Sequence, residues 1–378
     1  MHSSILEKIE QSRKREYLER FRPVEILREL LENLASREQE ILRRRFYLDP
    51  SKATEKETLE NIGQTLKITR ERVRQIEKEA LSKLRTISKE LGDSSPLNIV
   101  SELSNSVIEE HGGIMEKEHL VETLRSLANT GKEYDSILLF FLHELLSEKF
   151  EYIEEGEHNL PGWKLPFQNL DTFHKVHEIL HEIIEREKHL FLLEELLEKV
   201  AKTLKEKQIQ IAFAESTLIA HLRLAKKIES NVFSEWGLVD WPTVRPRHMN
   251  DKIYFILKRE GRPLHFKEIA EKINIAGFGH KVAYPATIHN ELILDDKYVL
   301  VGKGMYALKD WGYTKGTVSE VIEEIFRDKK TPLLKNAIID EVLKRRFVKK
   351  TTIQLALMNK QKFRRIETGE YNLVSSSV

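Results

Sequence analysis

The sequence of 378 residues contains no cysteine and no apolar run long enough to cross a bilayer. The absence of cysteine excludes disulfide bonds, thiol nucleophiles and cysteine-ligated zinc. The opening stretch, MHSSILEKIEQSRKREYLERF, lacks the apolar centre of a signal peptide and resembles a basic amphipathic helix. We therefore expect a cytoplasmic protein without a membrane partner.

Motifs for catalysis are also missing. There is no phosphate-binding glycine loop, HExxH motif or nucleophile elbow, so we expect no enzyme activity, cofactor or small-molecule substrate. The segment HKVHEILH places His174, His177 and His181 on one helix face, where two imidazoles would be able to share a cation. Because the sequence shows no third ligand, we predict no metal site and expect a solvated or partner-facing histidine face.

Charge is distributed unevenly, although the formal net charge is only +1. Residues 1–92 carry 21 Lys and Arg against 17 Asp and Glu, residues 93–245 carry 16 against 28, and residues 246–378 carry 25 against 16. Basic segments attract phosphate by releasing counterions. The acidic middle should be repelled by DNA, and it suits a basic protein surface or a spacer.

The segment 58–85, TLENIGQTLKITRERVRQIEKEALSKLR, predicts two helices joined by a three-residue turn. Thr69 is placed to cap the second helix, and Gly63 allows the first helix to approach it closely. We expect the first helix, roughly 58–66, to bury apolar side chains: Leu59 or its neighbours Ile62 and Leu66.

The second helix has two distinct faces at 100° per residue. Its apolar face spans about 80° and its polar face about 140°. Arg can pair with guanine, Gln with adenine, and Glu can accept from cytosine, so the polar face is typical of a helix that enters a major groove. A charged, solvated helix end is the alternative, because such faces are common. The apolar face holds Val73, Ile76, Ala80 and Leu84, and the polar face holds Arg70, Glu71, Arg74, Gln75 and Lys78.

The order of residues resembles a known family. LENIG-x4-ITRERVRQIE-x2-AL-x-KLR resembles the region-four helix-turn-helix of the primary bacterial sigma factors, and residues 23–46 resemble the two helices before it. Ser36 and Gln39 form a capping-box pattern ahead of the second of these. The resemblance covers about 23–88. It implies that the module reads a −35 promoter element and docks on the flap of the RNA polymerase β subunit.

The resemblance also implies which side chains contact DNA. It assigns five positions of the second helix to DNA contact, with two positions of the first helix near the backbone, and we add Thr69 and Lys78 to the DNA-binding set. Only about 22 residues precede the module, so we expect the parts that read and melt the −10 element to be absent. A sigma-like factor therefore fits better than a complete sigma factor. The implied contacts are Arg70, Glu71, Arg72, Arg74 and Gln75, with Leu59 and Glu60 near the backbone.

Beyond residue 93 the sequence predicts four tandem copies of one unit. Each has three helices and a two-stranded end with Gly or Asn at its turn. We therefore predict a mainly α fold in which a helix-turn-helix module precedes four winged-helix-like units with small β-hairpin wings; four generic helical hairpins are the alternative. The expected domains are a basic amphipathic helix at 1–22, the module at 23–92, and the first to fourth repeats at 98–167, 168–246, 247–315 and 316–374.

The third and fourth repeats carry further signals. PLHFKEIAEKI and GKGMYAL in the third repeat resemble the HARE-HTH family, which includes a domain of the RNA polymerase δ subunit and implies a nucleic-acid or transcription adaptor. Basic residues in the fourth repeat can clamp phosphate strands on either side of a groove, and a solvated basic edge is the alternative. These secondary DNA-binding candidates are Lys344, Arg345, Arg346, Lys349, Lys350, Lys362, Arg364 and Arg365.

These patterns predict a nucleoid-associated, sequence-specific transcription initiation factor or regulator that binds promoter double-stranded DNA and core RNA polymerase. The alternative is a polymerase accessory subunit that acts mainly through protein contacts, like the δ subunit, without recognising promoters itself. The acidic middle favours the alternative, whereas the basic face at 70–78 favours the first hypothesis.

Overall fold

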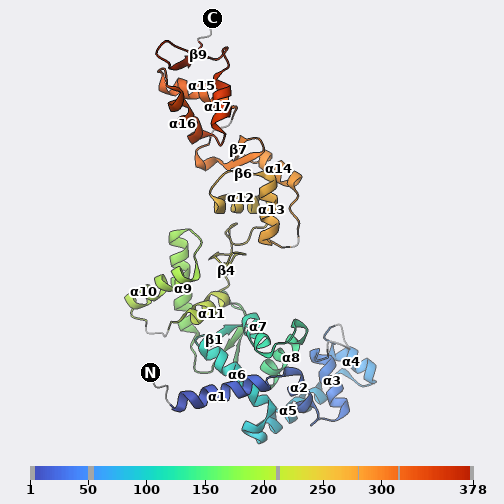
Figure 1. The fold of residues 1–378 in the computed structure, drawn as a ribbon. Helices are drawn as coiled ribbons and strands as arrows, with labels where there is room; N and C mark the ends of the chain where they lie inside the picture. The colour runs from blue at the N-terminus through green and yellow to red at the C-terminus, as the bar shows by residue number, and fades with distance from the viewer. Residues whose placement is uncertain (1–4, 50–54, 210–212, 280, 314–315, 375–378) are drawn as a thin grey trace. The chain divides into compact units, whose positions relative to one another are not determined.

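The computed structural model describes residues 5–49, 55–209, 213–279, 281–313 and 316–374, with side chains from Arg13 onward. The chain divides into two compact bodies, residues 1–229 and 230–378, called here the N-terminal and C-terminal bodies. Helices dominate both bodies, and the strands form small antiparallel sheets (Figure 1), which confirms the predicted mainly α fold class. The boundary between the two bodies falls inside the predicted 168–246 repeat. The bodies therefore do not test the predicted domain boundaries, which stay predictions. Among the described residues, no helix combines the length and apolar character that a bilayer crossing requires.

The helix-turn-helix module opens the N-terminal body. Its α3 begins at Ser36, and the carboxylate of Glu38 accepts the backbone N–H of Ala35 at 2.9 Å. The predicted capping box of Ser36 and Gln39 is therefore wrong by one residue, and the Gln39 amide instead donates to the carbonyl of Leu34 at 3.0 Å. The helices are α1 (Ile5–Arg20), α2 (Pro23–Leu31), α3 (Ser36–Phe46), α4 (Leu59–Leu66) and α5 (Arg70–Leu91).

The first repeat follows with three helices and a three-stranded sheet in the order β1-β3-β2. Trp163 pairs across the sheet with both Met115 and Tyr152 and is fully buried. The third predicted helix, 134–146, continues beyond α8 as one π-helical turn, Phe141–Leu145. The elements are α6 (Pro96–Glu110), β1 (Ile114–Glu116), α7 (Lys117–Ala128), α8 (Asp135–Phe140), β2 (Glu151–Ile153) and β3 (Gly162–Lys164).

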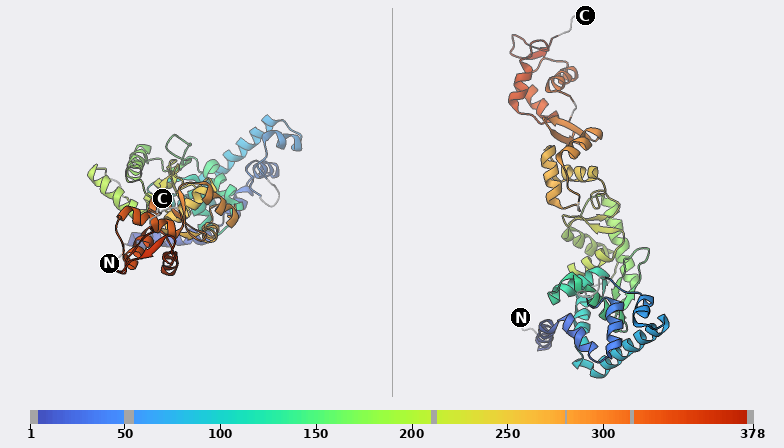
Figure 2. Two further views of the ribbon diagram at one scale, coloured as in Figure 1. Left: turned by 90° about the horizontal axis from the view of Figure 1, so that it is seen from above. Right: turned by 90° about the vertical axis from the view of Figure 1, so that its right-hand side faces the viewer.

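The module and the first repeat share one hydrophobic core. Helix α2 packs against α6 and α8, while α5 packs against α6. Leu30 and Leu84 from the module lie in the same buried cluster as Val100 and Phe141 from the repeat. Each such side chain contributes about 1.5–3 kcal/mol by leaving water. The two segments therefore fold together, with α3 and α4 at the margin of the N-terminal body (Figures 1 and 2).

The second repeat has helices α9, α10 and α11, and α9 packs against both of the others. The Ser216 hydroxyl donates to the carbonyl of Glu110 at 2.6 Å, which ties this repeat to α6 of the first. The elements are α9 (Leu170–Glu187), α10 (Leu193–Glu206), α11 (Glu215–Leu224), β4 (Ile228–Ser230) and β5 (Trp236–Leu238).

The C-terminal body holds the third and fourth repeats, each with its own buried cluster. Gly304 at φ 69° and Gly369 at φ 84° confirm the predicted glycine turns at the two-stranded ends of these repeats, because both turns use left-handed backbone. The elements are α12 (Met249–Glu260), β6 (Leu264–His265), α13 (Phe266–Ala276), α14 (Pro285–Leu294), β7 (Tyr298–Gly302), β8 (Met305–Leu308), α15 (Val318–Lys329), α16 (Lys335–Arg345), α17 (Lys350–Leu357), β9 (Phe363–Arg365) and β10 (Tyr371–Leu373).

Candidate nucleic-acid interface

Helix α5 stands on a small core of its own. Ile41 from α3 and Ile62 from α4 meet Val73 and Ile76 from α5, and all four are buried. The four predicted inward positions of α5 are all buried, which confirms the inward face, and the helix is thereby fixed in rotation. Its opposite face, which carries the polar positions of the 3.6-residue period, is exposed to solvent.

The turn between α4 and α5 depends on local backbone geometry. A Cβ on Gly63 would lie 2.8 Å from the carbonyl oxygen of Ile68, so only glycine fits there, and the predicted close approach is confirmed. Lys67 adopts left-handed backbone at φ 52° and ends α4. The Thr69 hydroxyl then accepts the backbone N–H of Arg72 at 3.2 Å, which confirms the predicted cap of α5.

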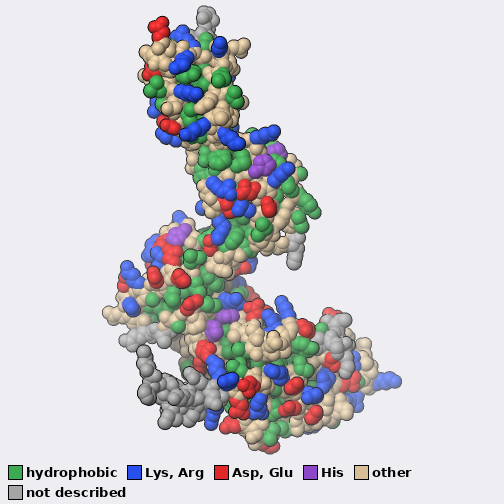
Figure 3. Space-filling model, viewed as in Figure 1, with side chains coloured by type: hydrophobic (Ala, Val, Ile, Leu, Met, Phe, Trp, Pro, Cys, Tyr) green, Lys and Arg blue, Asp and Glu red, His purple; other side chains and the backbone are tan. Residues whose placement is uncertain are grey.

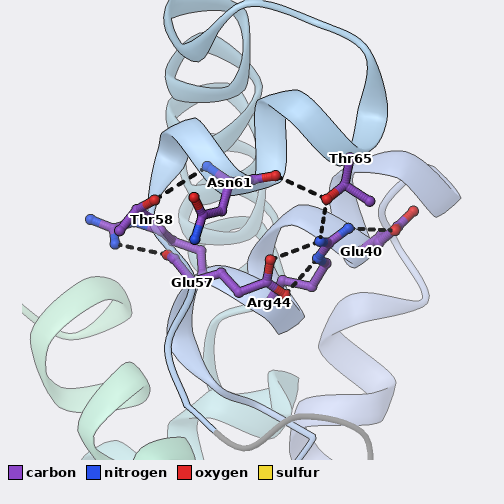
Figure 4. Close-up of polar contacts among 7 residues, drawn as sticks. Glu40, Arg44, Glu57, Thr58, Asn61 and Thr65 are labelled. Atoms are coloured by element: carbon purple, nitrogen blue, oxygen red, sulfur yellow. Dashed lines mark hydrogen bonds and ion pairs between the residues drawn. The ribbon is translucent and has the colours of Figure 1, made fainter.

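A half-buried ion pair positions the start of α4 (Figure 4). The Arg44 guanidinium donates to both carboxylate oxygens of Glu57, at 2.8 and 2.7 Å, and to the Thr65 hydroxyl at 3.0 Å. Hydrogen bonding to Arg44 lowers the pKa of Glu57, and the same bond raises the pKa of Arg44. The pair therefore connects α3, the segment before α4, and α4 itself. The sequence analysis did not identify Arg44. Its partners Glu57 and Thr65 lie 13 and 21 residues further along the chain and meet it only in the folded protein.

The predicted DNA-contacting side chains of α5 gather on one exposed face. Arg74 donates to Glu71 through two hydrogen bonds, at 2.9 and 2.6 Å, and Arg72 donates to the Gln75 side chain at 3.1 Å. Hydrogen bonding to Arg74 lowers the pKa of Glu71, which stays ionised. Side chains that suit base edges are thus held in pairs, and DNA binding would exchange these partners for base edges and phosphates. The exposed residues are Thr69, Arg70, Glu71, Arg72, Arg74, Gln75 and Lys78.

Helix α4 exposes fewer groups than α5 that could contact a DNA duplex. Glu60 is exposed in its first turn, whereas Leu59 is half-buried and packs against the Ile62 core. The backbone N–H groups at the start of α4 are partly used, since the Thr58 hydroxyl accepts the N–H of Asn61 at 3.2 Å. Leu59 therefore serves the core first, and a contact with the DNA backbone stays a prediction.

The structure separates the basic residues of the fourth repeat into two groups. Arg346 is buried, and its guanidinium donates to the carbonyl of Leu300 at 2.6 Å, so it does not join an exposed basic patch. Burial lowers the pKa of Arg346. Arg345 is held by Asp328 at 3.0 Å and is only 22% exposed. The prediction that both belong to a phosphate clamp disagrees with these positions, because their side chains face the body of the protein.

The remaining basic side chains of the fourth repeat reach solvent. Lys and Arg are frequent over α15–α17 in the space-filling view (Figure 3). Lys344 pairs with Glu341 at 2.9 Å, and Lys362 pairs with Glu323 at 2.7 Å. The exposed set that flanks α17 and the β9 strand is Lys349, Lys350, Arg364 and Arg365.

Comparison with known proteins finds a match over the module. The family model described as "Sigma-70, region 4" matches residues 30–86. The chain is 44% identical over 70 residues to RNA polymerase sigma factor SigA of Lactococcus lactis subsp. cremoris, which is 18% of each chain. It is 52% identical over 64 residues to the protein of that name from Synechocystis sp., which is 16% of this chain and 14% of the relative. The chain thus spans less than a fifth of the length of these curated relatives.

Proposed function

We propose that this chain is a sigma-like transcription factor that recognises a −35-like promoter element through α5 and contacts RNA polymerase. The observation that carries the proposal is the exposed Arg and Gln face of α5, which is capped by Thr69, packed on Ile62 and located inside the matched sigma region. A helix with base-pairing side chains on its outer face and a rigid apolar inner face is what major-groove recognition requires.

The proposed mechanism is bridging between DNA and protein. In this proposal α5 supplies base contacts, while the β-subunit flap is the polymerase surface that the sigma resemblance implies. The exposed cations that flank α17 would add phosphate contacts, which strengthen binding without reading sequence. The acidic middle of the chain suits a basic protein surface.

A second candidate function is that of an accessory subunit acting through protein contacts. It is favoured by α14, the third helix of the third repeat, which exposes large apolar side chains at its two ends and no Lys or Arg. Tyr284, Ile293 and Leu294 are 63%, 62% and 82% exposed. Such a surface suits a protein partner better than a phosphate backbone. The proposed HARE-HTH character of this repeat would then place it on the transcription machinery.

Selection of bound sequences from random duplex DNA, with and without core RNA polymerase, separates the two functions. A short motif recovered by the protein alone supports promoter recognition by α5, and a motif recovered only with polymerase supports a sigma-like subunit. No motif in either arm, despite a stable polymerase complex, would leave the accessory function. Arg74→Ala should relax the motif at one base position. Arg15→Ala, which removes an 84% exposed arginine from α1, is the matched control and should leave it unchanged.

A further inference from the structure

A cavity of about 310 Å³ in the N-terminal body gathers histidines from two repeats. Three of them follow one another along α9, and the fourth, His158, comes from the segment between β2 and β3 of the first repeat. Carboxylates of α9 also line it. The lining residues are His158, His174, His177, His181, Glu178, Glu182, Glu185 and Lys227.

The α9 histidines differ in exposure, and His174 and His181 are half-buried. His177 is only 5% exposed and stacks on Phe173, so the expectation of a solvent- or partner-facing surface is wrong for it. The Nδ1 atoms of His174 and His177 are buried and have no hydrogen-bond partner among the described residues. A buried imidazole nitrogen without a hydrogen-bond partner has a lone pair to offer to a ligand.

His158 supplies the ligand that the sequence did not show. Backbone hydrogen bonds hold it in place: Lys226 N–H donates to the His158 carbonyl at 3.0 Å, and Leu160 N–H donates to the Leu224 carbonyl at 2.8 Å. Its ring centre then lies 5.8 Å from that of His177 and 6.1 Å from that of His174. Two imidazoles on one Zn²⁺, each with a Zn–N bond of about 2.0–2.1 Å, have ring centres about 5–6 Å apart.

A second group of possible metal ligands has its ligand atoms closer together. Among the described residues, only Glu187, His189 and Glu195 place three possible ligand atoms within 4.8 Å of one another. Lys199 already occupies that cluster, at 2.9 Å from Glu187 and 3.7 Å from Glu195, so its negative charge has a partner. Lys227 lines the histidine cavity as well. The histidine cavity differs in its buried imidazole nitrogens, because Nδ1 of His174 and Nδ1 of His177 have no hydrogen-bond partner among the described residues.

We propose that His158, His174 and His177 form a binding site for a divalent transition-metal ion, with His181 or a carboxylate of α9 as the fourth ligand. Imidazole and carboxylate ligands suit ions such as Zn²⁺. Because His158 belongs to the first repeat and the others to α9 of the second, the bound ion would link the two repeats. The site lies apart from α5 in the chain and does not depend on DNA binding.

Titration of the metal-stripped full chain with ZnCl₂ in a calorimeter tests the site. We expect the wild-type chain to bind one Zn²⁺ and His158→Ala to bind it about tenfold more weakly or worse, since one ligand is lost. His158 is 44% exposed, so its removal leaves the fold intact, whereas removal of the buried His177 can also disturb packing. His189→Ala is the matched control and should bind Zn²⁺ as the wild type does.

Three outcomes would overturn the proposal. The wild-type chain would fail to bind Zn²⁺, His158→Ala would bind it with unchanged affinity, or His189→Ala would lose it, which would assign the ion to the Glu187 cluster. Absorption of bound Co²⁺ provides a second readout, because its intensity reports tetrahedral coordination and the chain has no thiolate to contribute. We expect the tetrahedral spectrum in the wild type and its loss in His158→Ala.

Discussion

At the scale of single residues, the pairing of Arg74 with Glu71 determines how α5 would read DNA. The Arg74 guanidinium would give up two hydrogen bonds to Glu71 on binding a base. Only a base that accepts two hydrogen bonds would compensate for them. A guanine offers two acceptors to one guanidinium, whereas other bases do not. If Arg74 contacts a base as proposed, the pair would make it selective for guanine.

We expect Arg74→Ala to cost about 1–3 kcal/mol of specific binding and to relax preference at one base position. The measurement is binding to a series of duplexes in which each has one base pair changed. Arg15→Ala removes the same charge from an exposed position on α1 and is the control. Equal weakening on specific and random duplexes would show that Arg74 contacts phosphate only.

Gly63 provides a test of the turn that aims α5. A Cβ would lie 2.8 Å from the Ile68 carbonyl oxygen, which is backbone and cannot turn away as a side chain can. We expect Gly63→Ala to destabilise the module by about 1–3 kcal/mol through overpacking and to weaken DNA binding with it. Denaturant unfolding measures the change. The exposed neighbour Gln64 is the control, since Gln64→Ala should leave stability within about 0.5 kcal/mol; a neutral Gly63→Ala would disprove the close approach.

At the scale of elements, sequence periodicity predicted which face of a helix is buried, because that face is set by apolar residues repeated along the helix. The inward face of α5 follows from four apolar positions, and the Thr69 cap follows from a residue type that favours this place. The start of α3 was misplaced because Ala35 has no capping side chain, while Glu38 supplies the cap from within the helix. Strands β1 and β6 were missed, since two or three residues are too few to show alternation.

The Arg44–Glu57 pair, which joins α3 to α4, gives the module an acid sensitivity. Hydrogen bonding to Arg44 lowers the pKa of Glu57 below its ordinary value of 4.5. The pair therefore contributes stability that is fully present above pH 4.5 and is lost as the pH falls through the lowered pKa. We expect Glu57→Gln to cost about 1 kcal/mol at pH 7, since the two-bond geometry places the pair at the upper end for partly exposed ion pairs.

The measurement for Glu57→Gln is denaturant unfolding across a pH series. The wild-type and variant curves should differ at neutral pH and converge at pH values well below 4.5, where the Glu57 carboxylate is protonated. Glu60→Gln, an exposed carboxylate on α4, should follow the wild type throughout. A difference that persists unchanged into acid would mean that the lost interaction is not the ion pair.

At the scale of the whole molecule, repeat patterns predicted the sequence of helices and wings but not which repeats share a core. The burial of Leu30 and Leu84 beside Phe141 joins the module to the first repeat, although these residues lie far apart in the sequence. The placement of Arg346 against Leu300 likewise depends on how the fourth repeat meets the third. Contacts between segments leave no periodic signal, so a single sequence cannot reveal them.

The fourth repeat provides the test of whether the whole chain, rather than α5 alone, engages DNA. Lys349, Lys350, Arg364 and Arg365 are exposed cations that would contact phosphates and carry no base information. Each phosphate contact releases a counterion and adds about 0.9 to the slope of log K against log salt concentration. We expect Lys349→Ala with Lys350→Ala to lower that slope by up to about 2 on specific and random DNA alike.

The control for this pair is Lys335→Ala, at an exposed lysine of α16 outside the cluster, which should leave the slope unchanged. Arg74→Ala should behave differently from both, because it changes the preference among sequences more than the salt dependence. If the double variant kept the full slope while Arg74→Ala relaxed the motif, DNA contact would be confined to the module. The exposed cations of the fourth repeat would then be free to meet an acidic protein surface, and the bridge to polymerase would begin there.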